Sequence, residues 1–136
     1  MKTIRILILE DDLKTLSFLL LKLNSLEEEL LINGRGDIAV TVLSEYTQVE
    51  EYINKSMVDF DVILLDRDCK AGGSFHILNF ERFGLNKIIS ISSTPQWNKE
   101  AVERGVKDVI HKDYEELDKF SDKVIDKIKE IIKIKI

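Results

Sequence analysis

Short apolar runs alternate with amphipathic helical patterns along the chain. Residues 4–9 are apolar but for one arginine, with isoleucine at every second position, and the run stops at three acidic residues. A run that is apolar on both faces is typical of a strand covered on both sides, as in a parallel sheet. Leucines then recur at intervals of three and four residues over 16–30, which predicts a helix that begins after an aspartate N-cap and ends at Asn33-Gly34.

The same alternation repeats four more times. The pattern predicts further strands at 38–43, 62–65, 88–91 and 106–110, and helices at about 47–53, 74–82, 94–105 and from 113 onward. Thr47 to Glu50 has the pattern of a capping box. Thr94-Pro95 joins an N-cap residue to a proline at the first helical position. The chain is therefore expected to contain five consecutive strand–helix units.

Five such units predict one α/β domain. Strands that alternate with helices form right-handed crossovers and a parallel sheet. For 136 residues, we expect a three-layer flavodoxin-like (βα)5 sandwich with a five-stranded parallel sheet in the order 2-1-3-4-5. This single domain is expected to span residues 1–136.

Composition and charge narrow the functional classes. With 20 basic and 25 acidic side chains the formal net charge is −5, which argues against direct nucleic-acid binding because that binding needs clustered lysine and arginine. The single cysteine, Cys69, excludes an intramolecular disulfide and fits a reducing compartment. Charge-free runs are only as long as a strand, and the N-terminus lacks a signal-peptide pattern, so we expect a cytoplasmic protein without membrane contact.

Polar residues follow each predicted strand. In the order 2-1-3-4-5, the ends of the first and third strands flank the point where strand order reverses, which is where open α/β sheets bind ligands. Glu10, Asp11 and Asp66 are therefore expected in one crevice. Two carboxylates ~4 Å apart repel by roughly 4 kcal/mol at an effective dielectric constant near 20. Lys112 and a divalent cation would offset this repulsion, and an oxygen-only open site suits Mg²⁺.

These residue types together favour phosphoryl transfer. Asp66 can act as a nucleophile and form an aspartyl phosphate. Mg²⁺ and Lys112 would neutralise charge on the transferring group, and the Ser92 hydroxyl would bond to a phosphoryl oxygen.

Four segments resemble receiver domains of bacterial two-component response regulators. They are Ile-Leu-Ile-Leu-Glu-Asp-Asp at 6–12, Asp-Val-Ile-Leu-Leu-Asp at 61–66, Ile-Ser-Ile-Ser-Ser at 89–93 and Gly-Val-Lys-Asp-Val-Ile-His-Lys at 105–112. No one of these motifs is specific, but their order makes the joint signal strong, and the resemblance covers essentially the whole chain.

The resemblance implies a signalling switch controlled by phosphorylation, rather than a metabolic enzyme. Asp66 matches the phospho-acceptor, which takes phosphate from a histidine of a sensor kinase. Glu10 and Asp11 match the acidic pair that holds Mg²⁺ together with Asp66. Asp68 matches the position whose backbone carbonyl completes the metal site.

The resemblance also assigns Ser92 as the Ser/Thr switch residue and Lys112 as the lysine that pairs with the phosphoryl group. The implied partners are a sensor histidine kinase and a downstream effector, and a homodimer stays open. Two positions depart from the family pattern. Val109 replaces the usual aromatic residue, so the usual aromatic rotamer switch cannot operate. Asp113 stands where many members have proline, which makes a trans peptide bond the expectation.

Two other functions remain open from the sequence. Asp66-Arg-Asp68 is similar to the Asp-x-Asp signature of haloacid-dehalogenase-like phosphatases, although that family's nucleophile strand usually comes first. Val109 and Asp113 are also compatible with a pseudo-receiver, an interaction module that no longer uses phosphate. Trp97 would anchor a partner, pack in the core or simply be partly exposed, and Cys69 is best interpreted as an incidental thiol.

Overall fold

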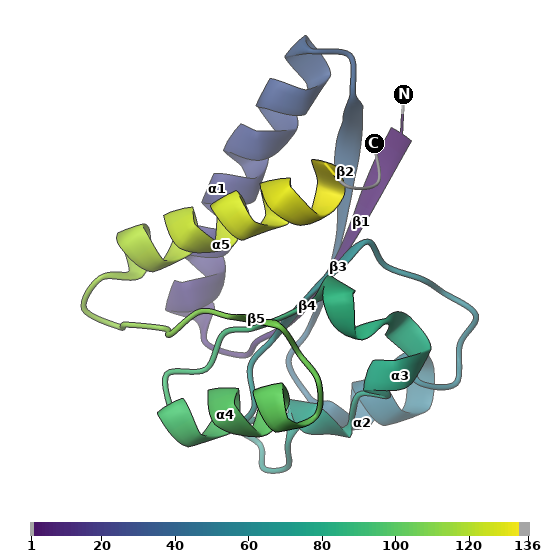
Figure 1. Cartoon of the computed structure of the whole chain (residues 1–136), viewed down its shortest axis with the longest axis vertical. Helices are drawn as coiled ribbons and strands as arrows, with labels where there is room; N and C mark the ends of the chain where they lie inside the picture. The colour runs from purple at the N-terminus through teal and green to yellow at the C-terminus, as the bar shows by residue number, and fades with distance from the viewer. Residues whose placement is uncertain (1, 134–136) are drawn as a thin grey trace.

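The computed structural model describes residues 2–133 and contains one five-stranded sheet (Figure 1). All neighbouring strands are parallel, and their order is β2-β1-β3-β4-β5, as the sequence predicts. The elements, in chain order, are β1 (Lys2–Leu9), α1 (Leu13–Ile32), β2 (Gly36–Leu43), α2 (Tyr46–Gln48), η1 (Val49–Ile53), β3 (Val62–Leu65), η2 (Phe75–Ile77), α3 (Phe80–Phe83), η3 (Leu85–Lys87), β4 (Ile88–Ser90), α4 (Pro95–Glu103), β5 (Asp108–Val109) and α5 (Leu117–Lys133).

Two hydrophobic layers cover the two faces of the sheet. Alternate residues of β1 point to opposite faces: Ile6 and Ile8 belong to the layer with α1 and α5, whereas Leu7 and Leu9 belong to the layer with η1, α3 and α4. Figure 1 shows α1 and α5 together on one face and α2, α3 and α4 on the other. The three-layer flavodoxin-like sandwich is therefore confirmed.

Helix α1 begins directly behind the acidic residues that end β1. The Asp12 carboxylate accepts hydrogen bonds from the backbone N–H of Thr15 (2.9 Å) and from its hydroxyl (2.6 Å), an N-cap that typically contributes about 1 kcal/mol. These bonds lower the pKa of Asp12 below its ordinary value. Because Asp12 is the cap, Asp11 is free to face the end of the sheet.

Two predicted helices differ from the structure. The capping box at Thr47 is wrong, since α2 already begins at Tyr46, behind Glu45, and continues as the π-helical turn η1. The predicted helix 74–82 is divided into the 3-10 turn η2 and the short helix α3. Extended backbone at Leu78 separates them, and Asn79 caps α3 by accepting a bond from Arg82 N–H (3.2 Å).

The C-terminal elements are shorter than expected. Strand β5 has only two residues, and α5 begins at Leu117 rather than near residue 113. The segment before α5 is a turn, because the Asp113 side chain accepts a bond from Glu115 N–H (3.0 Å) and its carbonyl accepts one from Glu116 N–H (3.0 Å). Within the described residues every peptide bond is trans. No helix between residues 2 and 133 is long and apolar enough to cross a bilayer.

The predicted limits of the domain, 1–136, include residue 1 and residues 134–136, which lie outside the described part of the chain. They remain a prediction.

Candidate functional site

Three carboxylates meet beyond the carboxyl ends of β1 and β3. These strands are neighbours, with Leu9 paired to Leu65, so the residues that follow them lie side by side. One carboxylate oxygen from each of Glu10, Asp11 and Asp66 lies within 4.8 Å of the other two. The structure therefore brings together the acidic residues that the sequence placed in one crevice.

Lys112 reaches this cluster from the segment after β5. Its side chain is buried, and its Nζ lies 2.5 Å from Glu10 Oε1 and 3.2 Å from Asp66 Oδ2. Its backbone N–H is held by the carbonyl of Ser92 at 3.1 Å. One ammonium group thus compensates part of the negative charge of the three carboxylates.

Burial and the neighbouring charges shift the pKa values of this pair. Burial, together with repulsion from Asp66, raises the pKa of Glu10 to about 7, although Lys112 acts in the opposite direction. Burial by itself would lower the pKa of Lys112, but the carboxylates of Glu10 and Asp66 outweigh it and raise that pKa above its ordinary value. Lys112 is therefore a permanent cation at physiological pH.

The three carboxylates differ in how far the protein already uses their oxygens. Glu10 Oε2 accepts bonds from the N–H groups of Asp11 (3.0 Å) and Asp12 (3.1 Å), while Oε1 faces Lys112. Asp66 is bonded through Oδ2 alone, and Asp11 Oδ2 accepts a bond from the backbone N–H of Lys70. Within the described residues, Oδ1 of Asp11 and Oδ1 of Asp66 have no hydrogen-bond donor. These two oxygens are the best candidates for a cation.

The donor set fits Mg²⁺. Among the described residues, the side-chain ligands of this cluster are all carboxylate oxygens, which are the hard ligands that Mg²⁺ prefers. Mg²⁺ is usually held by one or two carboxylates together with water and phosphate. When all three carboxylates are ionised, Lys112 leaves two negative charges uncompensated. A divalent cation would neutralise them.

The segment after Asp66 turns back on itself. Asp68 pairs with Ser74 in an antiparallel bridge. The hydrogen bonds that flank the bridge use the carbonyl of Arg67 (2.8 Å) and the N–H of Cys69 (3.3 Å). Since consecutive residues of a strand point their backbone groups in opposite directions, the Asp68 carbonyl faces away from this bridge.

The Asp68 side chain does not join the carboxylate cluster. Its Oδ1 is paired with Arg67 Nη1 (2.9 Å), and its Oδ2 accepts a bond from Trp97 Nε1 (3.0 Å). If Asp68 contributes to a metal site, its backbone carbonyl is the available group. The sequence does not show the bond to Trp97, because the two residues lie 29 positions apart.

Ser92 follows β4, the strand next to β3, and its hydrogen bonds run to the start of α4. Its hydroxyl accepts a bond from Thr94 N–H (3.1 Å). Its N–H donates to Asn98 Oδ1 (3.1 Å), and its carbonyl accepts a bond from Asn98 Nδ2 (3.0 Å). The hydrogen bonds of Ser92 therefore go to Thr94, to Asn98 and to the backbone N–H of Lys112, and not to Asp66.

Sequence reasoning missed Asn98, although it fixes the segment that carries Ser92. Asn98 is buried and also accepts a 2.6 Å bond from the Ser90 hydroxyl. A sequence signal exists, because Asn98 lies one helical turn before the buried Ala101 and hence on the inner face of α4. A polar residue on such a face needs partners.

The side chains of Cys69 and His76 do not belong to the carboxylate cluster. Burial raises the pKa of the Cys69 thiol to about 11, which supports its interpretation as an incidental thiol. Burial lowers the pKa of His76, whose Nδ1 lies 3.3 Å from Glu100 Oε1. Neither residue belongs to a group of potential metal ligands in the described chain.

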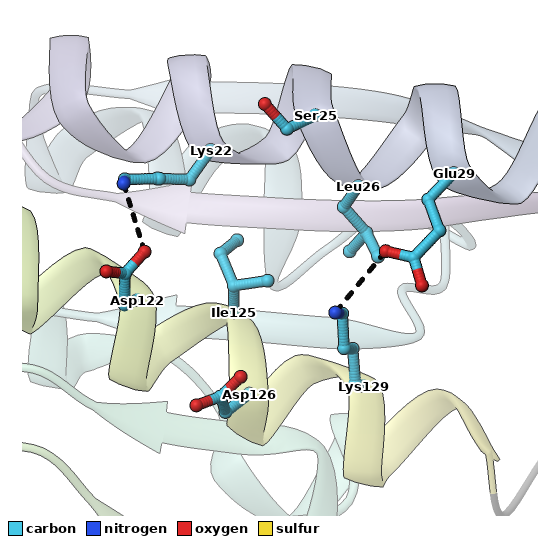
Figure 2. A pocket seen from close by; sticks show the side chains of 8 residues that line it. All are labelled: Lys22, Ser25, Leu26, Glu29, Asp122, Ile125, Asp126 and Lys129. Carbon is cyan, nitrogen blue, oxygen red and sulfur yellow. Dashed lines mark ion pairs between the residues drawn. The ribbon is translucent and has the colours of Figure 1, made fainter.

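A groove of about 490 Å³ lies elsewhere, between α1 and α5 (Figure 2). Its sides are joined by the ion pairs Lys22–Asp122 (3.0 Å) and Glu29–Lys129 (3.3 Å). None of the three clustered carboxylates lines this groove. These ion pairs join the two helices, so the charged residues of the groove contribute to the packing of α1 on α5.

Comparisons with known proteins assign the fold. No family model matches the sequence, and no curated protein matches it. Among solved structures, a Francisella response regulator receiver domain is similar, with 22% sequence identity, a TM-score of 0.58, and coverage of 93% of this chain and 97% of that chain. The non-phosphorylated HemR receiver domain from Leptospira biflexa shows 19% identity, a TM-score of 0.55 and coverage of 92% and 94%.

A third similar structure is the response regulator protein TrrA from Thermotoga maritima, solved in complex with Mg²⁺-BeF. It shows 15% identity, a TM-score of 0.53 and coverage of 91% of this chain and 98% of that chain. At these identities the comparisons establish the fold. This chain has the fold of response-regulator receiver domains over nearly its whole length, with an acidic cluster at the carboxyl ends of β1 and β3.

Proposed function

We propose that this chain is a phospho-accepting receiver domain of a two-component system, in which Asp66 takes phosphate from a sensor histidine kinase. The observation that carries the proposal is the position of Lys112, whose buried ammonium group contacts Glu10 and Asp66 beside the carboxylate of Asp11. Burial of a lysine is costly, and here the residue stabilises charge where a phosphoryl group would sit.

In the proposed reaction, one carboxylate oxygen of Asp66 attacks the phosphorus atom of a phosphohistidine. Lys112 contacts Oδ2, and Oδ1 has no donor among the described residues, so one oxygen can attack while the other is left for the cation. A P–O bond forms while the P–N bond to the kinase histidine breaks, and its electron pair remains on the imidazole nitrogen. The Lys112 ammonium then compensates charge on the acyl phosphate.

Glu10, Asp11, Asp66 and the Asp68 carbonyl are the proposed ligands of Mg²⁺ at this site. When bound, Mg²⁺ would supply positive charge for the carboxylates and the phosphoryl oxygens. Within the protein the roles divide. Asp11 and Asp66 each offer a free oxygen, whereas Glu10, with both oxygens in use, mainly holds Lys112 in place.

Ser92 is the proposed hydroxyl that reports the phosphoryl group. Its Oγ accepts a hydrogen bond from Thr94 N–H, so its own proton is available to a phosphoryl oxygen. We propose that this bond draws the Ser92 segment toward Asp66 and affects α4 through Asn98. The domain then acts as a switch for a downstream effector, and as a cytoplasmic signalling protein rather than a metabolic enzyme.

No observation favours the two other functions. A phosphatase of the haloacid-dehalogenase type needs its second aspartate as general acid or base, but the Asp68 carboxylate is bonded to Arg67 and Trp97. A pseudo-receiver has no need of a buried lysine between two carboxylates. The phosphorylation proposal therefore accounts for more of the site than either alternative.

The test is labelling with a small phosphodonor, such as acetyl phosphate, followed by intact mass spectrometry. We expect one phosphoryl group on the wild type with Mg²⁺, none without it, and none on Asp66→Asn. Asp126→Asn, an exposed aspartate on α5, is the matched control and should label like the wild type. Equal labelling of Asp66→Asn would refute the assignment, and repeated turnover of phosphate monoesters that depends on Asp68 would favour a phosphatase.

A further inference from the structure

Side chains of helix α4 contact the loop that follows Asp66. Trp97 of α4 donates from its indole N–H to Asp68 Oδ2 at 3.0 Å. The guanidinium of Arg67 lies over the same ring, with 3.8 Å between its Cζ and the ring centroid. Both residues that come next after Asp66 thus contact one side chain of α4.

Glu100, one turn further along α4, adds a second attachment. Its Oε2 lies 3.5 Å from Arg67 Nε, and its Oε1 lies 3.3 Å from Nδ1 of the buried His76 in η2. Arg67 Nε is inaccessible to solvent and makes no hydrogen bond within the described residues, so the Glu100 carboxylate is its nearest charged partner. Because the Arg67 and Glu100 side chains are 26% and 38% exposed, solvent partly screens this ion pair, and its main effect is to fix the position of the guanidinium.

The position at which receiver domains usually have an aromatic switch residue makes no comparable contact in this chain. Val109 of β5 has neither a ring to stack nor a polar group to donate a bond, and it is partly exposed. Trp97 combines a ring and an N–H donor at a different place on the fold, next to the loop itself. Besides the bonds between Ser92 and Asn98, the contacts between the site and α4 run through Trp97 and Glu100.

We propose that Trp97 and Glu100 are positioning residues, which act through Arg67 and Asp68 to couple the cation and phosphoryl site to α4. The inference rests on the proposed function, in particular on the Asp68 backbone carbonyl as a metal ligand. Arg67 and Trp97 hold both oxygens of the Asp68 side chain, so they restrict where its carbonyl can point. Coupling between two sites is reciprocal. Loosening the attachment to α4 should therefore weaken cation binding, because the Asp68 carbonyl is then less restricted.

The chain provides its own reporter, because Trp97 is its single tryptophan. The experiment titrates the wild type with Mg²⁺, and then with beryllofluoride at saturating Mg²⁺, and records tryptophan emission. Isothermal titration calorimetry measures the Mg²⁺ affinity in parallel. We expect an emission change with the same midpoint as the calorimetric curve, and a second change with beryllofluoride.

Variants then test the direction of the coupling. By calorimetry, Trp97→Phe and Glu100→Gln should each weaken Mg²⁺ binding about five-fold. This is the low end of measured allosteric couplings, and we expect it because the side chains that join α4 to the loop are partly exposed. Lys99→Ala, an exposed residue of α4 between them, is the control and should bind Mg²⁺ like the wild type. Asp68→Asn keeps an acceptor for the indole and should retain the emission change, whereas Asp68→Ala should lose most of it.

The possible outcomes separate this inference from the proposed function. Two results together would overturn the coupling and leave the phosphorylation proposal standing. In the wild type, tryptophan emission would stay constant while calorimetry shows Mg²⁺ binding, and Trp97→Phe would bind Mg²⁺ with wild-type affinity. A lower melting temperature of Trp97→Phe without a change in affinity gives a purely structural role and also overturns it. Absence of Mg²⁺ binding by the wild type overturns the metal site, and the coupling with it.

Discussion

Replacing Lys112 by methionine removes the positive charge from the centre of the site while keeping a long apolar side chain. The ammonium lies 2.5 Å from Glu10 and 3.2 Å from Asp66, so each pair attracts by roughly 5–7 kcal/mol at an effective dielectric constant near 20. Desolvation of the charges cancels much of this attraction. Breaking one side of a buried pair nevertheless typically costs about 3–5 kcal/mol, since the other charge is left uncompensated.

Two features of Glu10 place the expected loss of stability for Lys112→Met near the lower end of this range. Its Oε2 keeps two backbone N–H donors, and its pKa is already raised to about 7. Without the ammonium that pKa must rise further, so Glu10 takes up a proton more readily. We therefore expect a loss of about 3 kcal/mol near neutral or slightly alkaline pH. The loss should shrink as the pH falls, because a group whose pKa is higher in the folded state stabilises the fold only when protonated.

Urea unfolding of four proteins tests this reasoning: the wild type, Lys112→Met, Glu10→Gln and the double variant. Glu10→Gln should restore part of the stability of Lys112→Met, because it removes the unpaired buried charge, and the cycle should show a coupling energy well above about 0.5 kcal/mol. Lys119→Met, at an exposed ion pair of α5, is the control and should change stability by less than about 0.5 kcal/mol. A cost below about 1 kcal/mol for Lys112→Met, or no coupling to Glu10, would refute the proposed charge balance.

Four further expectations follow from the same structure. Mg²⁺ at ten times its dissociation constant should raise the free energy of unfolding by about 1.4 kcal/mol; Asp11→Asn should remove this gain in urea titrations. Because burial lowers the pKa of His76 in the folded state, its contribution to stability is present above about pH 6.5 and is lost as the pH falls through the folded pKa; His76→Gln should flatten that part of the stability profile. The native Cys69 thiol, with its pKa near 11, should react with Ellman's reagent at least ~100-fold more slowly than in urea; equal rates would contradict its burial. Gly73→Ala should cost about 2–3 kcal/mol in urea unfolding, because φ is +83° and a Cβ would clash with the Tyr46 ring.

Much of the fold could be predicted because its signals are local. The five apolar strands, the leucine stripe of α1 and the Thr94-Pro95 start of α4 depend on residues close together in sequence, and all are present in the structure. Strand order then followed from general rules for βαβ units. The acidic residues of the site were found for the same reason, since each follows directly after a strand.

The segments 46–53 and 74–83 were predicted less well, because tertiary contacts decide their form. Phe75, Phe80 and Phe83 are fully or almost fully buried, and they hold short turns against the sheet that would not be stable as isolated helices. Asn54 links the two segments by donating to Ile77 O (2.9 Å) and accepting from Asn79 N–H (2.9 Å). The sequence of either segment alone does not predict these hydrogen bonds.

The sequence by itself determined which chemical groups are available and at which end of the sheet they gather, because strand ends are marked by local pattern. Only the tertiary structure decided how these groups are paired. Lys112 meets Glu10 across 102 positions, and the indole of Trp97 meets Asp68 across 29. Contacts over such separations depend on how the layers pack and on which side chains are buried. The residues adjacent in sequence to any one position determine neither.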